Sequence, residues 1–182
     1  MSINPRRRPE GVLVSLDGVS GSALKTAAHA LKSNGYRGAG ISEWDASGIF
    51  GELAAAERDA GAPSPRVLLL LYAADLAFRL RWEIQPALAK GRTVIAAPYI
   101  ETAVAFGRAA GLPGGWVRNL FGFAPHAAEA RSVDASSARG YLEGFVEFAC
   151  QHVAGTRAGL SKDQLMARTR SHLKTTAGRK SR

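Results

Sequence analysis

The sequence is poor in cysteine and has no long apolar run. Its 182 residues include a single cysteine, Cys150, which excludes an internal disulfide and any zinc site built on several thiolates. The most apolar stretch, residues 67–74, ends at Asp75 and is far shorter than the roughly 20 residues of a membrane span. The arginines at positions 6–8 are not followed by an apolar signal segment. We therefore expect a cytoplasmic globular protein without a membrane segment.

Acidic residues are scarce at both ends of the chain, which gives a net charge of +9. Residues 11–155 hold 13 Lys or Arg and 13 Asp or Glu, whereas residues 1–10 carry +2 and residues 156–182 carry +7. Basic ends can bind nucleic acid, but these contain no aromatic side chain that could stack on a base, so such binding is the weaker interpretation. The predicted organisation is a basic arm (1–10), one domain (11–155) and a basic C-terminal helix and tail (156–182).

One strand–loop–helix stretch organises the chain. Residues 12–16 are an apolar run typical of a buried parallel strand, and a loop rich in Gly and Ser leads from them into a predicted helix that ends before Gly35. In such a unit the loop and the helix N-terminus direct backbone N–H groups at one point, and phosphate is the anion most often bound there. The candidate binding residues are Gly18, Gly21, Ser22, Lys25 and Thr26.

The phosphate-binding motif is nevertheless incomplete. The motif G-x-x-x-x-G-K-[ST] needs a second Gly close to the phosphates, a Lys for their oxygens and a Ser or Thr for Mg²⁺. Counted from Gly18, these positions hold Ala23, Leu24 and Lys25. A loop lengthened by one residue would restore a Lys25-Thr26 pair, but one step along a helix turns a side chain by about 100°. The sequence therefore favours a solvated Lys25 and a locally packed Leu24.

Strands and helices alternate along the rest of the chain. Strands are predicted at residues 36–41, 93–97 and 131–135. Helices are predicted at residues 47–60, 66–90, 99–106, 116–123, 137–153 and 162–174. Ser47 is expected to cap the first of these helices, and Ser161 with Gln164 to form a capping box. Pro86 is expected to kink the longest helix or to start a new turn in it. The alternation predicts a three-layer α/β fold with a mainly parallel sheet, helices on both faces, and function in the loops after Leu16, Ile41 and Ala97.

Residues 68–99, LLLLYAADLAFRLRWEIQPALAKGRTVIAAPY, resemble LLLFAADRAxHxxxxIxPALxxGxxVIxDRY of the thymidylate kinase family of P-loop nucleotide kinases. The residues identical to that pattern include Ile84, Pro86, Ala87, Leu88, Gly91, Val94, Ile95 and Tyr99. The resemblance covers residues 12–124. It implies a P-loop nucleotide kinase fold, ATP and Mg²⁺ as cofactors, and thymidine monophosphate (dTMP) as the phosphate acceptor. It also implies a homodimer formed through the apolar helix, with residues 68–71 partly at the contact.

The same resemblance shows which charged groups this chain lacks. The family's Asp-Arg before Tyr99 is Ala97-Pro98, the arginine after A-A-D is Leu76, and the loop lysine is Leu24. An arginine is also absent from residues 41–47, and the arginine-rich lid is missing after the fourth strand. Phosphoryl transfer depends on positioning and on cations. We therefore predict a catalytically inactive, thymidylate kinase-like protein, a pseudokinase that acts as a nucleotide-sensing, regulatory or scaffold dimer.

Two alternatives remain open. An active dTMP kinase would transfer the γ-phosphate of ATP with a rearranged loop, using Lys25 and Arg79 for catalysis and Thr26 with Asp17 for magnesium. Nucleic acid or an acidic partner could instead bind the basic ends. The four histidines show no spacing that predicts a catalytic partner.

Three retained residues suggest where an acceptor would bind. The resemblance places Tyr72, Arg79 and Tyr99 at the substrate site, with Tyr72 where the family has a Phe that stacks on the nucleobase. From the residues alone, Tyr72 is interpreted as a buried aromatic, Asp17 as a loop-capping acid, and Asp75 as an acid on a helix surface.

Overall fold

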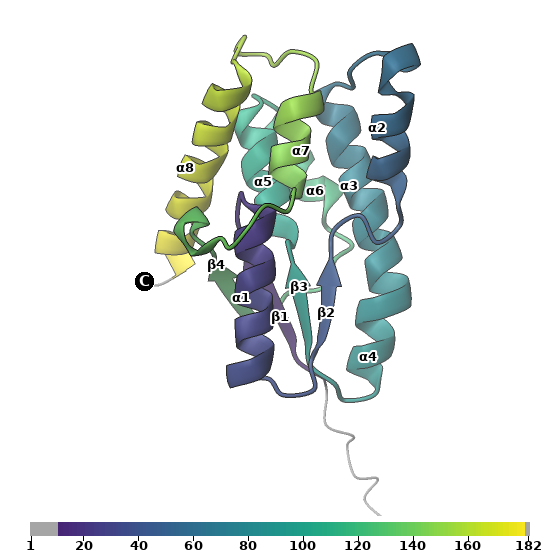
Figure 1. Ribbon diagram of the computed structural model, residues 1–182, viewed down its shortest axis with the longest axis vertical. Coiled ribbons are helices and arrows are strands. Elements are labelled where there is room, and N and C mark those ends of the chain that lie inside the picture. Colours follow the sequence, from purple (N-terminus) through teal and green to yellow (C-terminus); the bar gives the residue numbers. More distant parts are fainter. Residues whose placement is uncertain (1–10, 181–182) are drawn as a thin grey trace, which may run out of the picture.

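The computed structural model describes residues 11–180 and centres on a parallel β-sheet (Figure 1). The side chains of residues 57–60 and 176–180 are not part of the description, and the predicted basic arm lies outside it. The strands stand in the order β2-β3-β1-β4, and each pairs in parallel with its neighbour. They are β1 (Leu13–Asp17), β2 (Gly40–Glu43), β3 (Val94–Ala97) and β4 (Glu129–Ser132).

Two strands differ in position from their predictions. The second strand begins at Gly40, later than predicted, because Tyr36 to Ala39 form a turn that includes Gly38 at a positive φ of 83°. The fourth strand ends at Ser132 and begins earlier than predicted, because the N–H of Ala128 already donates to the β1 residue Leu13. Neither segment has the continuous apolar character that made β1 and β3 easy to place.

Helices fill the connections between the strands and continue beyond β4. They are α1 (Gly21–Asn34), α2 (Ile49–Ala60), α3 (Pro65–Arg79), α4 (Gln85–Ala89), α5 (Ile100–Ala109), α6 (Gly114–Leu120), α7 (Phe145–His152) and α8 (Lys162–Lys180). The π-helical turn η1 (Leu80–Ile84) joins α3 to α4, and η2 (Ala135–Ser137) is a 3₁₀ turn. The long predicted helix therefore exists, with η1 just before Pro86, which has no N–H to donate.

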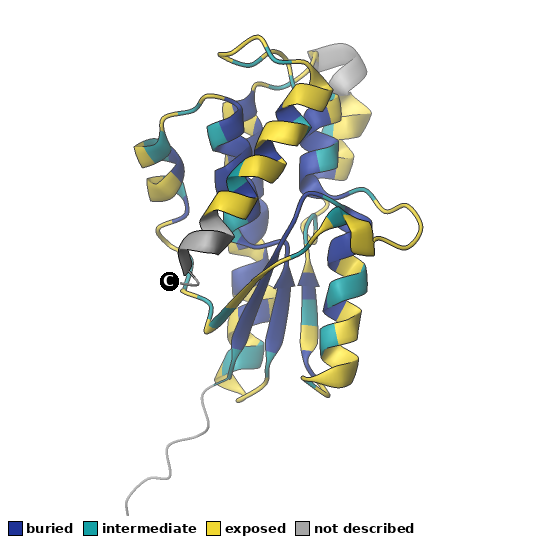
Figure 2. Ribbon diagram, turned by 90° about the vertical axis from the view of Figure 1, so that its left-hand side faces the viewer, coloured by how far each residue is buried: buried dark blue, intermediate teal, exposed yellow. Residues whose placement is uncertain are grey.

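The sheet has an apolar layer on each face, and its two inner strands, β1 and β3, are buried (Figure 2). On one face Val14, Leu16 and Ile95 pack against Leu24 and Ala28 of α1. On the other face Leu13, Val94 and Ala96 join the larger core formed with α3, α5 and α7. Burial of each leucine stabilises the fold by about 1.5–3 kcal/mol. The predicted three-layer α/β fold with a parallel sheet is confirmed.

The basic helix α8 packs against α5. Its residues Leu165, Thr169 and Leu173 are buried, and the Ser161 and Gln164 pair forms the predicted capping box. The division into 11–155 and 156–182 stays a prediction, but α8 contributes apolar side chains to the same core as α5. Within the part of the chain that the structure describes, no helix combines the length and apolarity needed to span a membrane.

The helix predicted at residues 137–153 is wrong in its first half. Only Phe145–His152 is helical, and residues 138–144 run as an irregular segment before it. Gly140 has a φ of +70°, and Gly144 is extended, so neither continues a helix. The apolar Tyr141 and Leu142, which matched a helical pattern, remain 76% and 40% exposed. This segment instead reaches the start of α1.

Candidate functional site

The loops after β1, β2 and β3 meet at the carboxyl ends of the strands, where parallel sheets bind ligands. A cavity of about 140 Å³ lies there, and ligand sites typically measure about 300–1,000 Å³. Its lining residues are Gly21, Leu24, Lys25, Glu43, Trp44, Ala97, Pro98 and Leu142. The space at the predicted site is small because another part of the chain covers the start of α1.

A carboxylate of the protein itself binds the N-terminus of α1. The backbone N–H of Gly21 donates to Oε2 of Glu147 at 3.0 Å, and the N–H of Gly144 donates to the same oxygen at 2.7 Å. Glu147 lies in the first turn of α7 and is half-buried. The α1 dipole and its unpaired N–H groups stabilise a negative charge at this point. Glu147 thus occupies the place where a phosphate-binding loop holds its anion.

Further hydrogen bonds attach residues 141–144, which we call the cover segment, to α1 and to the loop after β2. The N–H of Leu142 donates to the Ser22 hydroxyl, which in turn lies 3.4 Å from the carbonyl oxygen of Leu142. The indole N–H of Trp44, in the loop after β2, donates to the carbonyl of Glu143 at 3.2 Å. The cover segment is therefore held from both α1 and the β2–α2 loop.

The cover segment and α1 are in direct backbone contact at Gly21. A Cβ atom placed on Gly21 would lie only 2.5 Å from the N atom of Gly144 and from the carbonyl oxygen of Leu142. A Cβ atom on Gly144 would lie 2.8 Å from the Cα and N atoms of Gly21. Both glycines are required by this close approach, and no space for a phosphate remains between them.

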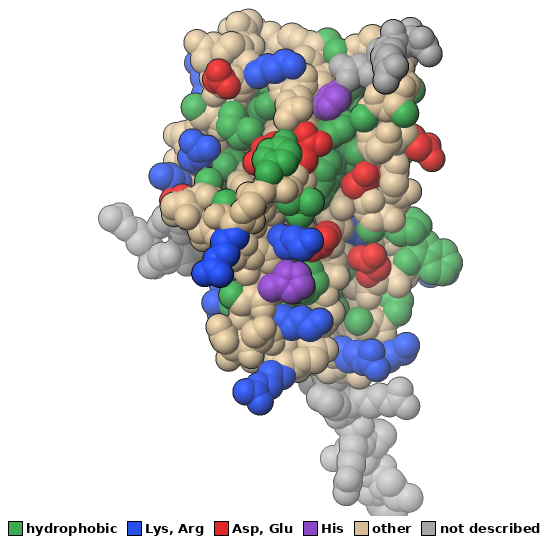
Figure 3. Space-filling view, viewed as in Figure 1, with side chains coloured by type: hydrophobic (Ala, Val, Ile, Leu, Met, Phe, Trp, Pro, Cys, Tyr) green, Lys and Arg blue, Asp and Glu red, His purple; other side chains and the backbone are tan. Residues whose placement is uncertain are grey.

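Leu24 and Lys25 lie on different sides of α1. Leu24 is 3% exposed and packs under α1 against the sheet. Lys25 is exposed near His29 and Arg139, in a region of α1 over which basic and histidine side chains gather (Figure 3). Lys25 also borders the 140 Å³ cavity, whereas Thr26 lines the open hollow beside His29. These positions agree with a solvated Lys25 and a packed Leu24.

Arg79 and Asp75 form a buried ion pair on α3. The Arg79 Nε atom lies 3.1 Å from Oδ2 of Asp75, and its Nη1 donates to the carbonyl of Pro98 at 3.0 Å. Both residues are 0% exposed, so the prediction that Asp75 is a surface acid is wrong. Asp75 also accepts hydrogen bonds from the N–H groups of Asp45 and Ser47 and from the Ser47 hydroxyl. Arg79 is thus sealed inside the protein.

The start of α2 is capped differently from the prediction. The carboxylate of Asp45 accepts hydrogen bonds from the N–H groups of Phe50 and Gly51 at 2.9 and 3.2 Å, which is the role that Ser47 was expected to fill. Ser47 is displaced from this role because its own N–H and hydroxyl bond Asp75.

Tyr72 and Tyr99 are also committed to internal contacts. The Tyr72 hydroxyl donates to the carbonyl of Tyr99 at 2.6 Å and accepts from Nη2 of Arg79 at 3.5 Å. Its ring lies 4.4 Å from that of Phe145, measured between centroids, and it is 0% exposed. Burial raises the pKa of Tyr72 above its ordinary value. The interpretation of Tyr72 as a buried aromatic describes its observed position.

Asp17 joins the end of β1 to the start of α5. Its Oδ1 atom accepts hydrogen bonds from the N–H of Tyr99 at 3.1 Å and from the N–H and hydroxyl of Thr102, both at 2.9 Å. The Thr102 hydroxyl also accepts from the N–H of Gly18. Burial raises the pKa of Asp17 to about 6, although the hydrogen bonds from Thr102 act in the opposite direction. Asp17 is therefore a loop-capping acid, as one interpretation of the sequence held.

The structure does not bring the alternative magnesium ligands together. Asp17 faces a cavity beside α5, whereas Thr26 lines a hollow on the outer side of α1. Among the side chains described, no group of three His, Cys, Asp or Glu residues is placed to hold a metal ion.

The sequence patterns did not predict a functional position for Glu147, Trp44 or the cover segment. Gly144 and Glu147 do have the spacing of a helix cap followed by an acidic third residue, a signal that predicts the start of α7. That signal places Glu147 on a helix but says nothing about its contact with Gly21, which is 126 positions away.

The structure is an α/β domain with a parallel sheet, in which the start of α1 is covered by residues 141–144 of the same chain. Among solved structures, the chain is similar to thymidylate kinase from Ehrlichia chaffeensis, with a TM-score of 0.66 and 14% identity over 94% of this chain and 83% of that one. It is also similar to thymidylate kinase from Candida albicans, with a TM-score of 0.62 and 18% identity over 91% and 77% of the two chains. No protein-family model and no curated protein matches the sequence. The chain therefore has a thymidylate kinase-like fold, as the resemblance implied.

Proposed function

We propose that this protein is a catalytically inactive, thymidylate kinase-like protein that acts as a regulatory or scaffold dimer. The observation that carries the proposal is the Glu147 carboxylate on the N–H of Gly21, at 3.0 Å. An anionic side chain at that point competes with any phosphate for the same donors and repels it. A nucleotide could bind there only after the cover segment had moved.

The cations of phosphoryl transfer are also missing from the site. Leu24 stands where the loop lysine is required, Ala97-Pro98 replaces an acid and an arginine, and Arg79 is paired with Asp75 in the core. Loss of one arginine that contacts the transferred phosphate costs about 10³ to 10⁵ in rate. The remaining Lys25 lies at the rim of the small cavity and does not replace this set.

The test is a coupled assay for ADP release from ATP·Mg²⁺ in the presence and absence of dTMP, together with a calorimetric titration of ATP·Mg²⁺. We expect no dTMP-dependent ADP release and no saturable ATP binding to the wild-type protein. Release of ADP that depends on dTMP would overturn the proposal and favour the active kinase, and an additional Lys25→Ala variant would then show whether Lys25 is its loop cation.

The Glu147→Ala variant separates the two reasons for inactivity. It removes the carboxylate from the α1 N-terminus but restores no cation, so we expect measurable binding of inorganic phosphate or ATP and still no turnover. Glu143→Ala is the matched control, because Glu143 contacts Trp44 through its backbone and not through its carboxylate. Equal phosphate binding by the two variants would show that Glu147 does not block the site.

The dimer is proposed from an exposed apolar face on α3 and η1. Val67, Leu70, Phe78 and Trp82 are 42%, 47%, 39% and 66% exposed and recur at helical spacing. Of the predicted contact residues 68–71, Leu68 and Leu69 are excluded, because both side chains are 0% exposed within the protomer. Sedimentation should give a dimer mass that Leu70→Glu converts to a monomer, whereas Phe123→Glu, at another exposed apolar position, should leave the mass unchanged. A monomeric wild-type protein would contradict the dimer.

A further inference from the structure

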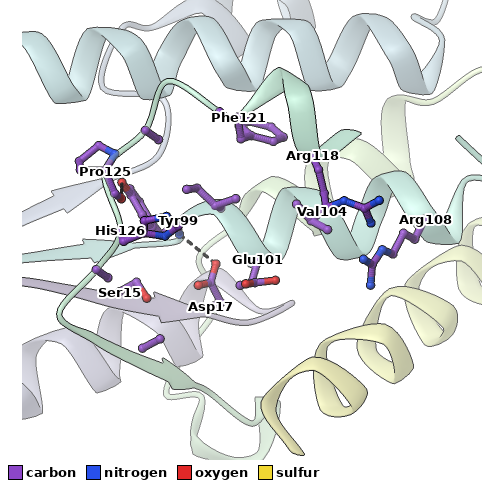
Figure 4. Close-up of a pocket in the computed structure, with 15 residues that line it drawn as sticks. Ser15, Asp17, Tyr99, Glu101, Val104, Arg108, Arg118, Phe121, Pro125 and His126 are labelled. Carbon is purple, nitrogen blue, oxygen red and sulfur yellow. Dashed lines mark hydrogen bonds between the residues drawn. The ribbon is translucent and has the colours of Figure 1, made fainter. Parts of the chain in front are cut away.

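A larger cavity lies on the other face of the sheet from α1. It has a volume of about 430 Å³ and is bounded by β1, α5, α6 and the loop that leads from α6 to β4 (Figure 4). This volume is within the range of small-molecule sites. Its lining includes no residue of α1 and no residue of the cover segment, so it is distinct from the covered phosphate site.

One end of this cavity carries the carboxylate of Asp17, whose second oxygen accepts no hydrogen bond from a described residue. Asp17 lines the cavity and is 4% exposed, and the donors from Tyr99 and Thr102 all bond its Oδ1 atom. No described residue donates to Oδ2. Burial of the carboxyl group disfavours its charged form and raises the pKa of Asp17 to about 6. A cationic donor placed at Oδ2 would offset this cost.

The other end of the cavity carries two arginines. Arg108 comes from α5 and Arg118 from α6, and Figure 4 shows both guanidinium groups beyond Val104 as seen from Asp17. Glu101, Val104 and Arg108 line one wall in order along α5. At a rise of about 1.5 Å per residue, the acidic and basic ends of that wall lie roughly 10 Å apart.

The surface between the two ends is apolar. Val104 of α5 and Phe121, at the end of α6, lie there, and both are buried. The cavity therefore combines a negative end, an apolar middle and a positive end.

We propose that this cavity binds a small, extended zwitterion. Its ammonium group bonds Oδ2 of Asp17, its carboxylate is held by Arg108 and Arg118, and its apolar spacer lies against Phe121. Arginine binds carboxylates through paired, charge-assisted hydrogen bonds, which fixes the orientation of the ligand. A simple anion is disfavoured by the acidic end and a simple cation by the arginines, so the charge pattern selects a molecule that carries both.

The experiment uses a series of unbranched amino acids with terminal amino groups, aminobutanoate, aminohexanoate and aminooctanoate, titrated into the full-length protein by NMR or calorimetry. Hexanoate and hexylamine are the controls that each carry one charged end. We expect one chain length to bind best, and to bind at least about tenfold more tightly than either singly charged control, because it makes both charge-assisted contacts.

Two kinds of variant locate the ligand. Asp17→Asn keeps an Oδ1 acceptor for the donors from Tyr99 and Thr102 and changes only the group that faces the cavity. It should weaken binding of the best zwitterion about tenfold, and Arg118→Ala should do the same at the other end. Lys32→Ala, at the exposed end of α1, should leave the affinity unchanged.

Several outcomes would overturn the proposal. They are no saturable binding of any probe, equal affinity for the zwitterion and the singly charged controls, or affinity that neither Asp17→Asn nor Arg118→Ala lowers. If Asp17→Asn does not fold, the Arg108→Ala/Arg118→Ala variant gives the decision, because these two side chains lie at the outer end of the cavity. None of these outcomes depends on whether the phosphate site is active.

Discussion

Two carboxylates flank the loop between β1 and α1, and they differ in what covers them. Glu147 comes from α7, bonds the N–H groups of Gly21 and Gly144, and closes the α1 side of the loop. Asp17 ends β1, accepts hydrogen bonds from Tyr99 and Thr102 at one oxygen, and lines the 430 Å³ cavity. The cavity on the α1 side is thus small, about 140 Å³, while the cavity on the α5 side is of ligand size, about 430 Å³.

The difference follows from the groups that each carboxylate meets. At the α1 N-terminus the helix dipole and the N–H group of Gly21 attract a negative charge and stabilise the Glu147 carboxylate there. Beside α5 the Asp17 carboxylate accepts three hydrogen bonds, all at Oδ1, yet its burial outweighs them and raises its pKa to about 6. The two acids therefore differ in effect: Glu147 stabilises the α1 side of the loop, whereas Asp17 on the other side has an oxygen to which no described residue donates.

The largest expected effect tests the Asp17 side through pH. The pKa of Asp17 is raised from 3.8 to about 6, which corresponds to about 3 kcal/mol at about 1.4 kcal/mol per pKa unit. The folded state therefore binds the proton more tightly than the unfolded state, and this contribution to stability is present at low pH and is lost as pH rises through 6.

Denaturant unfolding of the wild type and of Asp17→Asn at pH 7.5 and pH 4 separates the contribution of Asp17 to the pH dependence of stability from that of the other carboxylates. Relative to Asp17→Asn, the wild type should gain about 2.5 kcal/mol of unfolding free energy at pH 4, since the full value of about 3 kcal/mol is reached only below the unfolded-state pKa of 3.8. A constant difference between the two proteins would contradict a raised pKa.

The second prediction concerns a substitution that disrupts the contact between α1 and the cover segment by steric overlap. Gly21→Ala places a Cβ atom 2.5 Å from backbone atoms of residues 142 and 144, and we expect a loss of about 2–3 kcal/mol in the free energy of unfolding. Gly51→Ala is the control, because its Cβ meets only an Asp45 oxygen at 3.8 Å and should stabilise α2 by up to about 1 kcal/mol. Thermal and denaturant unfolding measure the stability of both variants. Equal stability changes for Gly21→Ala and Gly51→Ala would show that the cover segment moves away from the new Cβ atom without loss of stability.

The third prediction removes the charge that closes the α1 side. Glu147→Ala deletes two charge-assisted hydrogen bonds, and we expect a loss of about 2 kcal/mol, with Glu147→Gln intermediate. Amide hydrogen exchange of residues 141–144 should also become faster. Unchanged exchange in Glu147→Ala would mean that other contacts hold the cover segment.

The smallest expected effect concerns the second attachment of the cover segment. Trp44→Phe keeps an aromatic ring near Phe50 and Phe148 but removes the indole N–H that donates to Glu143. The loss should be about 1 kcal/mol, measured by denaturant unfolding. A loss as large as that of Glu147→Ala would show that the main attachment of the cover segment is to the β2–α2 loop and not to α1.

Sequence patterns predicted the framework well and the site only in part. The apolar runs of β1 and β3 are buried on both faces. The helical segment formed by α3, η1 and α4 ends at Ala89, within one residue of the helix predicted at residues 66–90. Both predictions succeeded because local periodicity reports burial directly. The helix predicted at residues 137–153 failed because Tyr141 and Leu142 fit a helical stripe yet are exposed on the cover segment. Asp75 was misplaced because its partner Arg79 makes a charged residue stable in the core.

The amino-acid sequence by itself determined the α/β framework and the absence of the motif lysine at position 24, which is Leu24. Both can be read directly from residue type and spacing. Only the tertiary structure decided that Glu147 bonds the N–H of Gly21 at the start of α1 and that Asp17 lines the 430 Å³ cavity. Those contacts join residues up to 126 positions apart in the chain, and their charges act through space at distances that spacing along the sequence does not report.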